Sequence, residues 1–130
     1  MSHFTKVKTN ITEKDLLIKT LDNLKLNWSR QKLLVSEYNS ERYFCDLIIK
    51  QQNNHQIGFT QKNNCYELIY DEMFWNLPLT ISSFNEKINS YYALNLITKN
   101  LSKNGFKIKD LTKQNEYGHV KIKINALRYN

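Results

Sequence analysis

The sequence contains few cysteines, prolines and glycines, and it has no long apolar run. Two cysteines cannot form a disulfide framework, and three glycines that lie far apart leave no Gly-rich phosphate-binding loop. No apolar run approaches the roughly 18 residues of a membrane-spanning helix. Residues 1–6 lack the apolar core of a secretory signal. We therefore do not expect a secreted disulfide scaffold, a P-loop nucleotide-binding protein or a membrane-spanning protein.

Recognisable catalytic and metal-binding motifs are missing as well. The chain has no C-x-x-C pair, no H-E-x-x-H and no G-x-S-x-G, and His3, His55 and His119 stand alone in the sequence. Cys45 and Cys65 fall on separate predicted strands, where a small buried apolar side chain is the simplest interpretation. We expect no metal, no cofactor and no enzymatic activity.

The composition is that of a folded domain encoded in an AT-rich genome. Apolar residues make up 41% and charged residues 24% of the 130 residues, which predicts a single domain over residues 1–130. Residue types with AT-rich codons form nearly half of the chain, whereas Arg, Gly, Ala and Pro are rare. Codon bias therefore explains part of the net charge of +7 and weakens the inference of an anionic partner.

The excess positive charge is concentrated in the last quarter of the chain. Lys107 and Lys109 alternate with apolar residues, and so do Lys121 and Lys123. If the two segments pair as strands, the four ammonium groups lie on one sheet face. Two interpretations are open: a platform for RNA or another anion, or a solvated face whose lysines discourage edge aggregation.

Residue periodicity and turn residues predict an α+β fold with the order β-α-β-β-β-β-α-β-β. Thr12 is predicted to cap the first helix, which ends near residues 25–27, and Ser83 with Glu86 forms a capping box for the second, which Gly105 ends. The predicted strands cover residues 4–9, 32–37, 43–50, 56–61, 65–70, 106–113 and 119–127. We expect a mainly antiparallel sheet, with a meander at residues 32–70 and both helices packed on one face.

The second helix is expected to bury one apolar stripe. Spacings of three and four residues indicate a stripe formed by Phe84, Ile88, Tyr91, Leu94, Ile97 and Leu101.

The irregular segment Asp71–Thr80 is the candidate for a contact with another protein. It holds Phe74 and Trp75, and loops often carry binding residues, among which Trp is frequent. The alternative is a loop that folds back, so that Trp75 fills the core beneath the sheet.

Segments along the whole chain resemble those of one known family. The most specific is the N-terminal nonapeptide that ends at Thr9, and Thr12–Leu17 fits as well. Further matches are Ile57-Gly58-Phe59, Tyr66-Glu67-Leu68, Asp71, Phe74, Trp75, Tyr92-Ala93-Leu94 and Gly105-Phe106. In these residues the chain resembles the hypothetical chloroplast reading frame family numbered thirty-five, a domain of unknown function in red-algal plastids and cyanobacteria. The resemblance implies a plastid-encoded protein of the stroma, and it brings no activity and no mapped site.

Composition, motifs and resemblance together predict a small stromal accessory or binding protein that acts through protein contacts. A role in the biogenesis of the photosynthetic apparatus is the expectation, and it rests on compartment and family alone. The alternative is an RNA-binding module that uses the basic C-terminal hairpin. The identity of the partner, the oligomeric state and the strand order remain open at this point.

Overall fold

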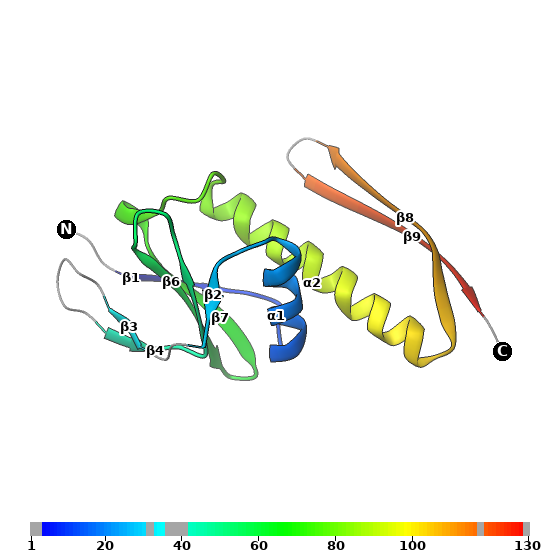
Figure 1. The fold of residues 1–130 in the computed structure, drawn as a ribbon, viewed down its shortest axis with the longest axis horizontal. Coiled ribbons are helices and arrows are strands. Elements are labelled where there is room, and N and C mark those ends of the chain that lie inside the picture. Colours follow the sequence, from blue (N-terminus) through cyan, green and yellow to red (C-terminus); the bar gives the residue numbers. More distant parts are fainter. Residues whose placement is uncertain (1–3, 31–32, 36–41, 117–118, 129–130) are drawn as a thin grey trace.

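The computed structural model describes residues 4–30, 33–35, 42–116 and 119–128 (Figure 1). Between residues 107 and 128 it describes the backbone, together with the side chain of Asn125. The fold is α+β, as predicted: a five-stranded antiparallel sheet carries two helices on one face, and two separate two-stranded sheets accompany it.

The central sheet has the strand order β1-β7-β6-β5-β2, and every neighbouring pair is antiparallel. β5, β6 and β7 are neighbours in sequence and in space, which confirms the predicted meander for these three strands. β2 was not predicted, because two residues are too few to show an alternating pattern. The strands are β1 (Phe4–Lys8), β2 (Trp28–Ser29), β5 (Leu47–Lys50), β6 (Gln56–Lys62) and β7 (Cys65–Asp71).

Asparagine supplies the turn between β6 and β7. Lys62 pairs with Cys65, and the two residues between them, Asn63 and Asn64, have φ values of 53° and 68°. A two-residue hairpin loop with both φ values positive matches the twist of the flanking strands, and Asn tolerates this conformation. The predicted strands over residues 56–61 and 65–70 already placed the connection at residues 62–64.

Two helices cover one face of the sheet: α1 (Lys14–Asn23) and the longer α2 (Ile81–Lys103) (Figure 1). Burial of each large apolar side chain contributes about 1.5–3 kcal/mol, so this layer holds most of the stability. The main core combines sheet and helix side chains: Ile11, Leu16, Leu17, Leu21, Leu47, Ile49, Ile57, Phe59, Tyr66, Leu68, Tyr70, Phe84, Ile88 and Tyr92.

A small hairpin covers part of the opposite face of the sheet. It consists of β3 (Leu33–Val35) and β4 (Arg42–Phe44). Leu34 packs against the sheet in a second cluster with Cys45, Ile48 and Ile69. The strand predicted over residues 43–50 is therefore two strands, β4 and β5, which belong to different sheets and are separated at Cys45 and Asp46.

The last two strands, β8 (Phe106–Glu116) and β9 (His119–Arg128), form a ribbon of their own. They pair with each other as predicted, and both contact α2 (Figure 1). Gly105, with φ 82°, lies between α2 and β8, which confirms its predicted left-handed conformation at the end of the helix.

α2 buries Phe84 and Ile88 as predicted, but the rest of the predicted stripe is not fully buried. Its buried side chains are Phe84, Ile88, Tyr92 and Asn95, whereas Ile97 is 44% exposed. The helix lies between the sheet layer and the β8–β9 ribbon, so apolar residues occur on two sides of it and one stripe does not describe it.

Both helices begin at residues other than those predicted. Thr80 is the N-cap of α2, and its hydroxyl accepts a hydrogen bond from the Ser83 amide at 3.1 Å. Ser83 therefore lies in the first turn, and the predicted capping box with Ser83 as N-cap is wrong. Glu13 rather than Thr12 is the N-cap of α1, and its side chain makes no capping hydrogen bond.

The start of α1 is instead capped by a side chain from α2. The Tyr92 hydroxyl accepts hydrogen bonds from the backbone amides of Thr12, at 3.3 Å, and Glu13, at 3.0 Å. Amides at a helix start have no partner within the helix, so a tertiary acceptor can replace a local cap. One side chain thus ties the two helices together and completes the end of one of them.

Replacing Tyr92 with Phe is expected to lower the free energy of unfolding by about 1–2 kcal/mol, because two partly buried amides lose their acceptor. Chemical denaturation measures the change. Tyr70→Phe is the control, because in the described part of the chain the Tyr70 hydroxyl makes no hydrogen bond, and it should cost at most about 0.5 kcal/mol. Equal losses in the two variants would contradict the capping role.

Candidate binding surfaces

The structure places Trp75 against the core. Its ring meets Tyr70 and Phe84 edge to face, with ring centroids 5.6 and 5.3 Å apart, and its Nε1 donates to the Leu79 carbonyl at 2.7 Å. This is the arrangement expected if the loop folds back and Trp75 fills the core. A role of Trp75 in binding a partner stays a prediction.

The neighbouring Phe74 closes the short helical turn η1 (Glu72–Phe74). Its ring stacks on His55, with centroids 3.8 Å apart, and its carbonyl accepts from the side chains of Gln51 and Asn53. Polar bonds to the turn at residues 51–55 therefore hold this segment in place. Phe74 is half-buried, and its role in binding also stays a prediction.

The four lysines of the predicted anion platform lie on β8 and β9, and their side chains lie outside the described residues. Strand register places Lys121 opposite Gln114, Lys123 opposite Thr112 and Lys107 opposite Leu127, so these three positions fall on one face of the ribbon. Lys109 falls at a register shift between residues 108 and 110. The backbone is thus compatible with the platform, which remains a prediction.

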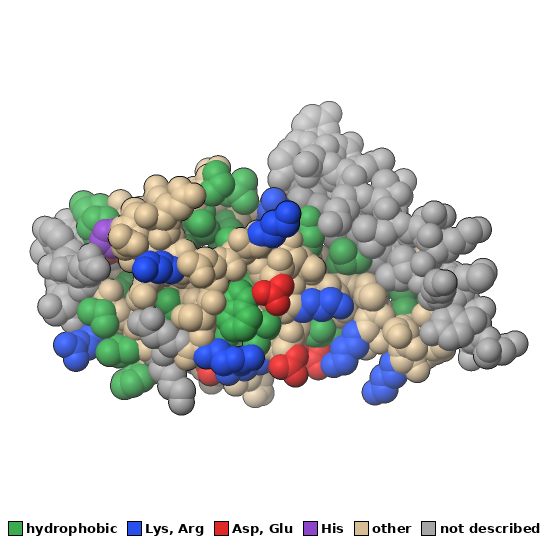
Figure 2. Space-filling model, viewed as in Figure 1, with side chains coloured by type: hydrophobic (Ala, Val, Ile, Leu, Met, Phe, Trp, Pro, Cys, Tyr) green, Lys and Arg blue, Asp and Glu red, His purple; other side chains and the backbone are tan. Residues whose placement is uncertain are grey.

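A surface that the sequence reasoning missed is the outward side of the β3–β4 hairpin. Leu34 and Tyr43 are opposite each other and point toward the sheet, so the pairs Leu33–Phe44 and Val35–Arg42 face outward. Phe44 is 80% exposed and Val35 is 36% exposed. We call these four outward residues the hairpin face; Figure 2 shows apolar and basic side chains together over this part of the molecule.

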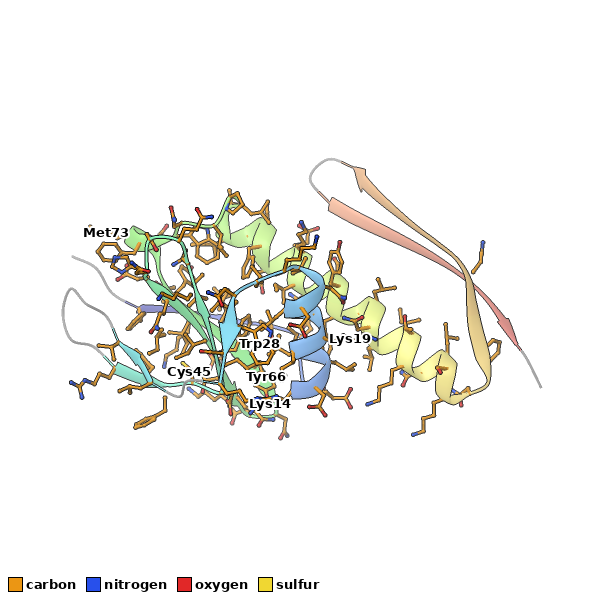
Figure 3. All side chains as sticks on the ribbon, viewed as in Figure 1. Lys14, Lys19, Trp28, Cys45, Tyr66 and Met73 are labelled. Carbon is orange, nitrogen blue, oxygen red and sulfur yellow. The ribbon has the colours of Figure 1, made fainter. Side chains whose placement is uncertain are left out.

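A hollow of about 440 Å³ lies beside Phe44. It is lined by Lys14 at the start of α1, by Arg30 after β2, and by Cys45, Asp46 and Thr60. Figure 3 labels Lys14, Trp28 and Cys45, which come from the elements around it. Asp46 already accepts a hydrogen bond from the Gln61 amide at 2.9 Å.

The two cations of this hollow are available to a partner. Among the described residues, no carboxylate lies within ion-pair distance of Lys14 or Arg30. The Arg30 guanidinium lies over the Trp28 ring at 5.5 Å, and the Trp28 Nε1 donates to Asp22 at 2.6 Å. Arg30 is thereby positioned by an aromatic ring, and no carboxylate of the described residues pairs with its charge.

One signal in the sequence could have located the hairpin face. Leu33, Leu34 and Val35 are three consecutive apolar residues on a short strand, and alternate residues of a strand point to opposite faces. Such a strand is apolar on both faces, so one of them is left exposed if a single layer covers it.

The two cysteines differ in their surroundings. Cys45 is 5% exposed, and burial, followed by the charge of Asp46, raises the pKa of its thiol to about 12. Cys65 is only half-buried, so the interpretation as a buried apolar residue is correct for Cys45 and wrong for Cys65. Among the described side chains, no group of three or more His, Cys, Asp or Glu residues could hold a metal ion.

No helix in the described ranges is both long enough and apolar enough to cross a membrane. Comparison with solved structures finds no match for the chain.

Comparison with other sequences identifies a family. A family profile described as a protein of unknown function (DUF1257) matches residues 20–122. Three relatives, each described as uncharacterized protein ycf35, match nearly the full length of both chains. The relative from Guillardia theta is 33% identical, and the match covers 98% of this chain and 99% of the relative. The relatives from Cyanophora paradoxa and Pyropia yezoensis are 30% and 32% identical, and each of these two matches covers 99% of this chain and 100% of the relative. These relatives support the plastid as the compartment, and the chain belongs to the ycf35 family, whose function is unknown.

Proposed function

We propose that this protein is a non-enzymatic binding protein of the plastid stroma that docks a partner protein on the hairpin face. The observation that supports it is the exposed Phe44 beside Lys14 and Arg30, two cations with which no carboxylate of the described residues pairs. The partner segment is apolar, to cover Phe44 and Val35, and acidic, to pair with the two cations. An accessory role in building the photosynthetic apparatus fits such a protein, and that part of the proposal rests on family and compartment.

The composition of the hairpin face favours a protein contact. Aromatic residues and Arg are enriched at the centres of protein interfaces, where a few side chains supply most of the binding energy. Phe44 and Val35 are large apolar side chains that water contacts at present, so covering them is favourable. Lys14 and Arg30 add attraction for acidic residues and discriminate against basic ones.

RNA is a weaker match to this surface. Single-stranded nucleic acid binders use several aromatic rings as stacking platforms, whereas two of the three apolar residues here, Leu33 and Val35, are aliphatic. The carboxylate of Asp46 in the hollow also opposes a phosphate. RNA binding through Lys107, Lys109, Lys121 and Lys123 stays a separate prediction.

Phe44→Ala is expected to weaken partner binding by at least about tenfold, because hot-spot truncations typically cost 2 kcal/mol or more. The tagged protein is incubated with nuclease-treated plastid extract, and peptides that tile each captured protein are then titrated by fluorescence anisotropy. Met73→Ala is the matched control, since Met73 is also an exposed apolar residue, at 62%, and neither belongs to the β3–β4 hairpin nor lines the hollow beside Phe44.

The proposal is supported if the bound peptide is apolar and acidic, and if Phe44→Ala weakens it while Met73→Ala does not. If Phe44→Ala binds the peptide as tightly as Met73→Ala does, the contact lies outside the hairpin face. Recovery of RNA from untreated extract, with all protein partners lost after nuclease, would overturn the proposal in favour of the basic ribbon.

A further inference from the structure

We propose that Cys65 is a thiol-exchange site that forms a mixed disulfide with glutathione. The site is a hollow of about 210 Å³ at the turn between β6 and β7, and it is separate from the hairpin face. Its lining contains one thiol, two cations and one carboxylate, contributed by Cys65, Lys8, Lys62 and Glu67.

Strand register brings these groups together. Lys62 is directly opposite Cys65 across the hairpin, and Lys8 of β1 is directly opposite Glu67 of β7. Cys65 and Glu67 are two residues apart on one strand, so they point to the same face of the sheet. Three neighbouring strands thus place two ammonium groups around a half-buried thiol.

Glu67 provides an independent sign of a ligand. Its side chain is only 7% exposed and lines the hollow. In the described part of the chain, no hydrogen bond or ion pair reaches its carboxylate, and Lys8 and Lys62 likewise have no carboxylate within ion-pair distance. The buried side-chain oxygens without a partner in the described ranges are Glu13 Oε2 and Asp71 Oδ2. The Glu67 carboxylate therefore keeps contact with solvent in the hollow, where the cationic donor of a ligand can pair with it.

Glutathione carries the complementary groups. It has two carboxylates, which suit Lys8 and Lys62, and one ammonium group, which suits Glu67. Its sulfur lies between these groups along the tripeptide, as the Cys65 sulfur lies among the three charged side chains of the hollow.

The reaction is a thiol–disulfide exchange with oxidised glutathione. The Cys65 thiolate attacks one sulfur of that disulfide, a new S–S bond forms to Cys65, and the old S–S bond breaks. One glutathione leaves as a thiolate and takes up the proton that Cys65 released. Cys65 is oxidised, the departing glutathione sulfur is reduced, and no further oxidant is needed.

The second cysteine is a built-in control. Cys45 is nearly inaccessible and lies beside the carboxylate of Asp46, so its thiol resists both deprotonation and attack on a disulfide. Exchange in the folded protein is therefore expected at Cys65 alone.

The test compares two disulfides on the full-length protein. Oxidised glutathione and the neutral bis(2-hydroxyethyl) disulfide are each incubated with the wild type and with the Lys8→Gln/Lys62→Gln variant, and intact mass with peptide mapping follows the modification. Loss of the two cations is expected to reduce the rate ratio, glutathione over the neutral disulfide, by about tenfold. Because both disulfides react with the same thiol, a change in the reactivity of Cys65 alters both rates equally and leaves their ratio unchanged. Lys8 and Lys62 are exposed, so the variant is expected to remain folded.

A second comparison tests Glu67. Glu67→Gln is expected to slow exchange with oxidised glutathione relative to exchange with 3,3′-dithiodipropionate, which has the carboxylates and lacks the ammonium group. Modification of Cys45 as fast as Cys65, or a rate ratio that the lysine variant leaves unchanged, would overturn the proposal. Modification at Cys65 alone with both ratios changed as described would support it.

Discussion

Trp75→Ala is expected to lower the free energy of unfolding by about 3 kcal/mol, one of the largest single-residue effects in this chain. The ring contacts Tyr70 and Phe84 and also packs against the main core cluster. Its removal leaves a cavity between the sheet and α2, and the Leu79 carbonyl loses its donor. Urea denaturation followed by circular dichroism measures the loss.

Phe44→Ala is the matched control for this experiment. Both substitutions remove a large aromatic side chain, but Phe44 is 80% exposed, so its loss should change stability by no more than about 0.5 kcal/mol. The two variants therefore separate a structural aromatic residue from a binding one. A Trp75→Ala protein that is as stable as the wild type and no longer binds a partner would restore the loop as the contact surface.

Local signals in the sequence predicted much of the fold. β1 and the β5–β6–β7 meander follow from alternating residues and Asn turns, and Gly105 ends α2 because only a left-handed residue suits that position. These features depend on residues close together in the chain. The local residue pattern is therefore sufficient to predict these features.

Features that depend on distant residues could not be predicted in this way. The cap of α1 comes from Tyr92, which lies 80 residues after Thr12, and no local pattern indicates it. The same limit applies to the candidate site: Phe44 and Trp75 are both aromatic, and the sequence does not reveal which face of each element another layer covers. The sequence left open whether Trp75 lies on the surface or fills the core, and it did not indicate that Phe44 is exposed.

Gly58→Ala is expected to destabilise the protein by about 1–3 kcal/mol through overpacking. Gly58 lies on β6 between Ile48 and Ile69, under the β3–β4 hairpin. A Cβ at this position would overlap the Cys45 sulfur and would lie 3.2 Å from the Leu34 side chain. The hairpin must then move away from the sheet, because both neighbours are buried.

A double-mutant cycle tests that explanation. Cys45→Ala removes the sulfur that the new methyl group meets, so Gly58→Ala should cost less in that background, by about 1 kcal/mol. In the Gly58→Ala protein the Cys45 thiol should also react faster with a thiol reagent than it does in the wild type. Additive losses, with no gain in Cys45 reactivity, would show that the hairpin does not rest on this glycine.

The same substitution links packing to the proposed function. The hairpin face is held in place by its inward side, where Tyr43 meets Phe4 edge to face at 5.4 Å and Lys6 lies 4.8 Å from the Tyr43 ring centroid. If Gly58→Ala displaces the hairpin, Phe44 moves away from Lys14 and Arg30 although none of these residues has changed. Partner affinity should then fall in Gly58→Ala and recover partly in the double variant with Cys45→Ala. Unchanged affinity in a destabilised Gly58→Ala protein would separate the binding surface from the hairpin.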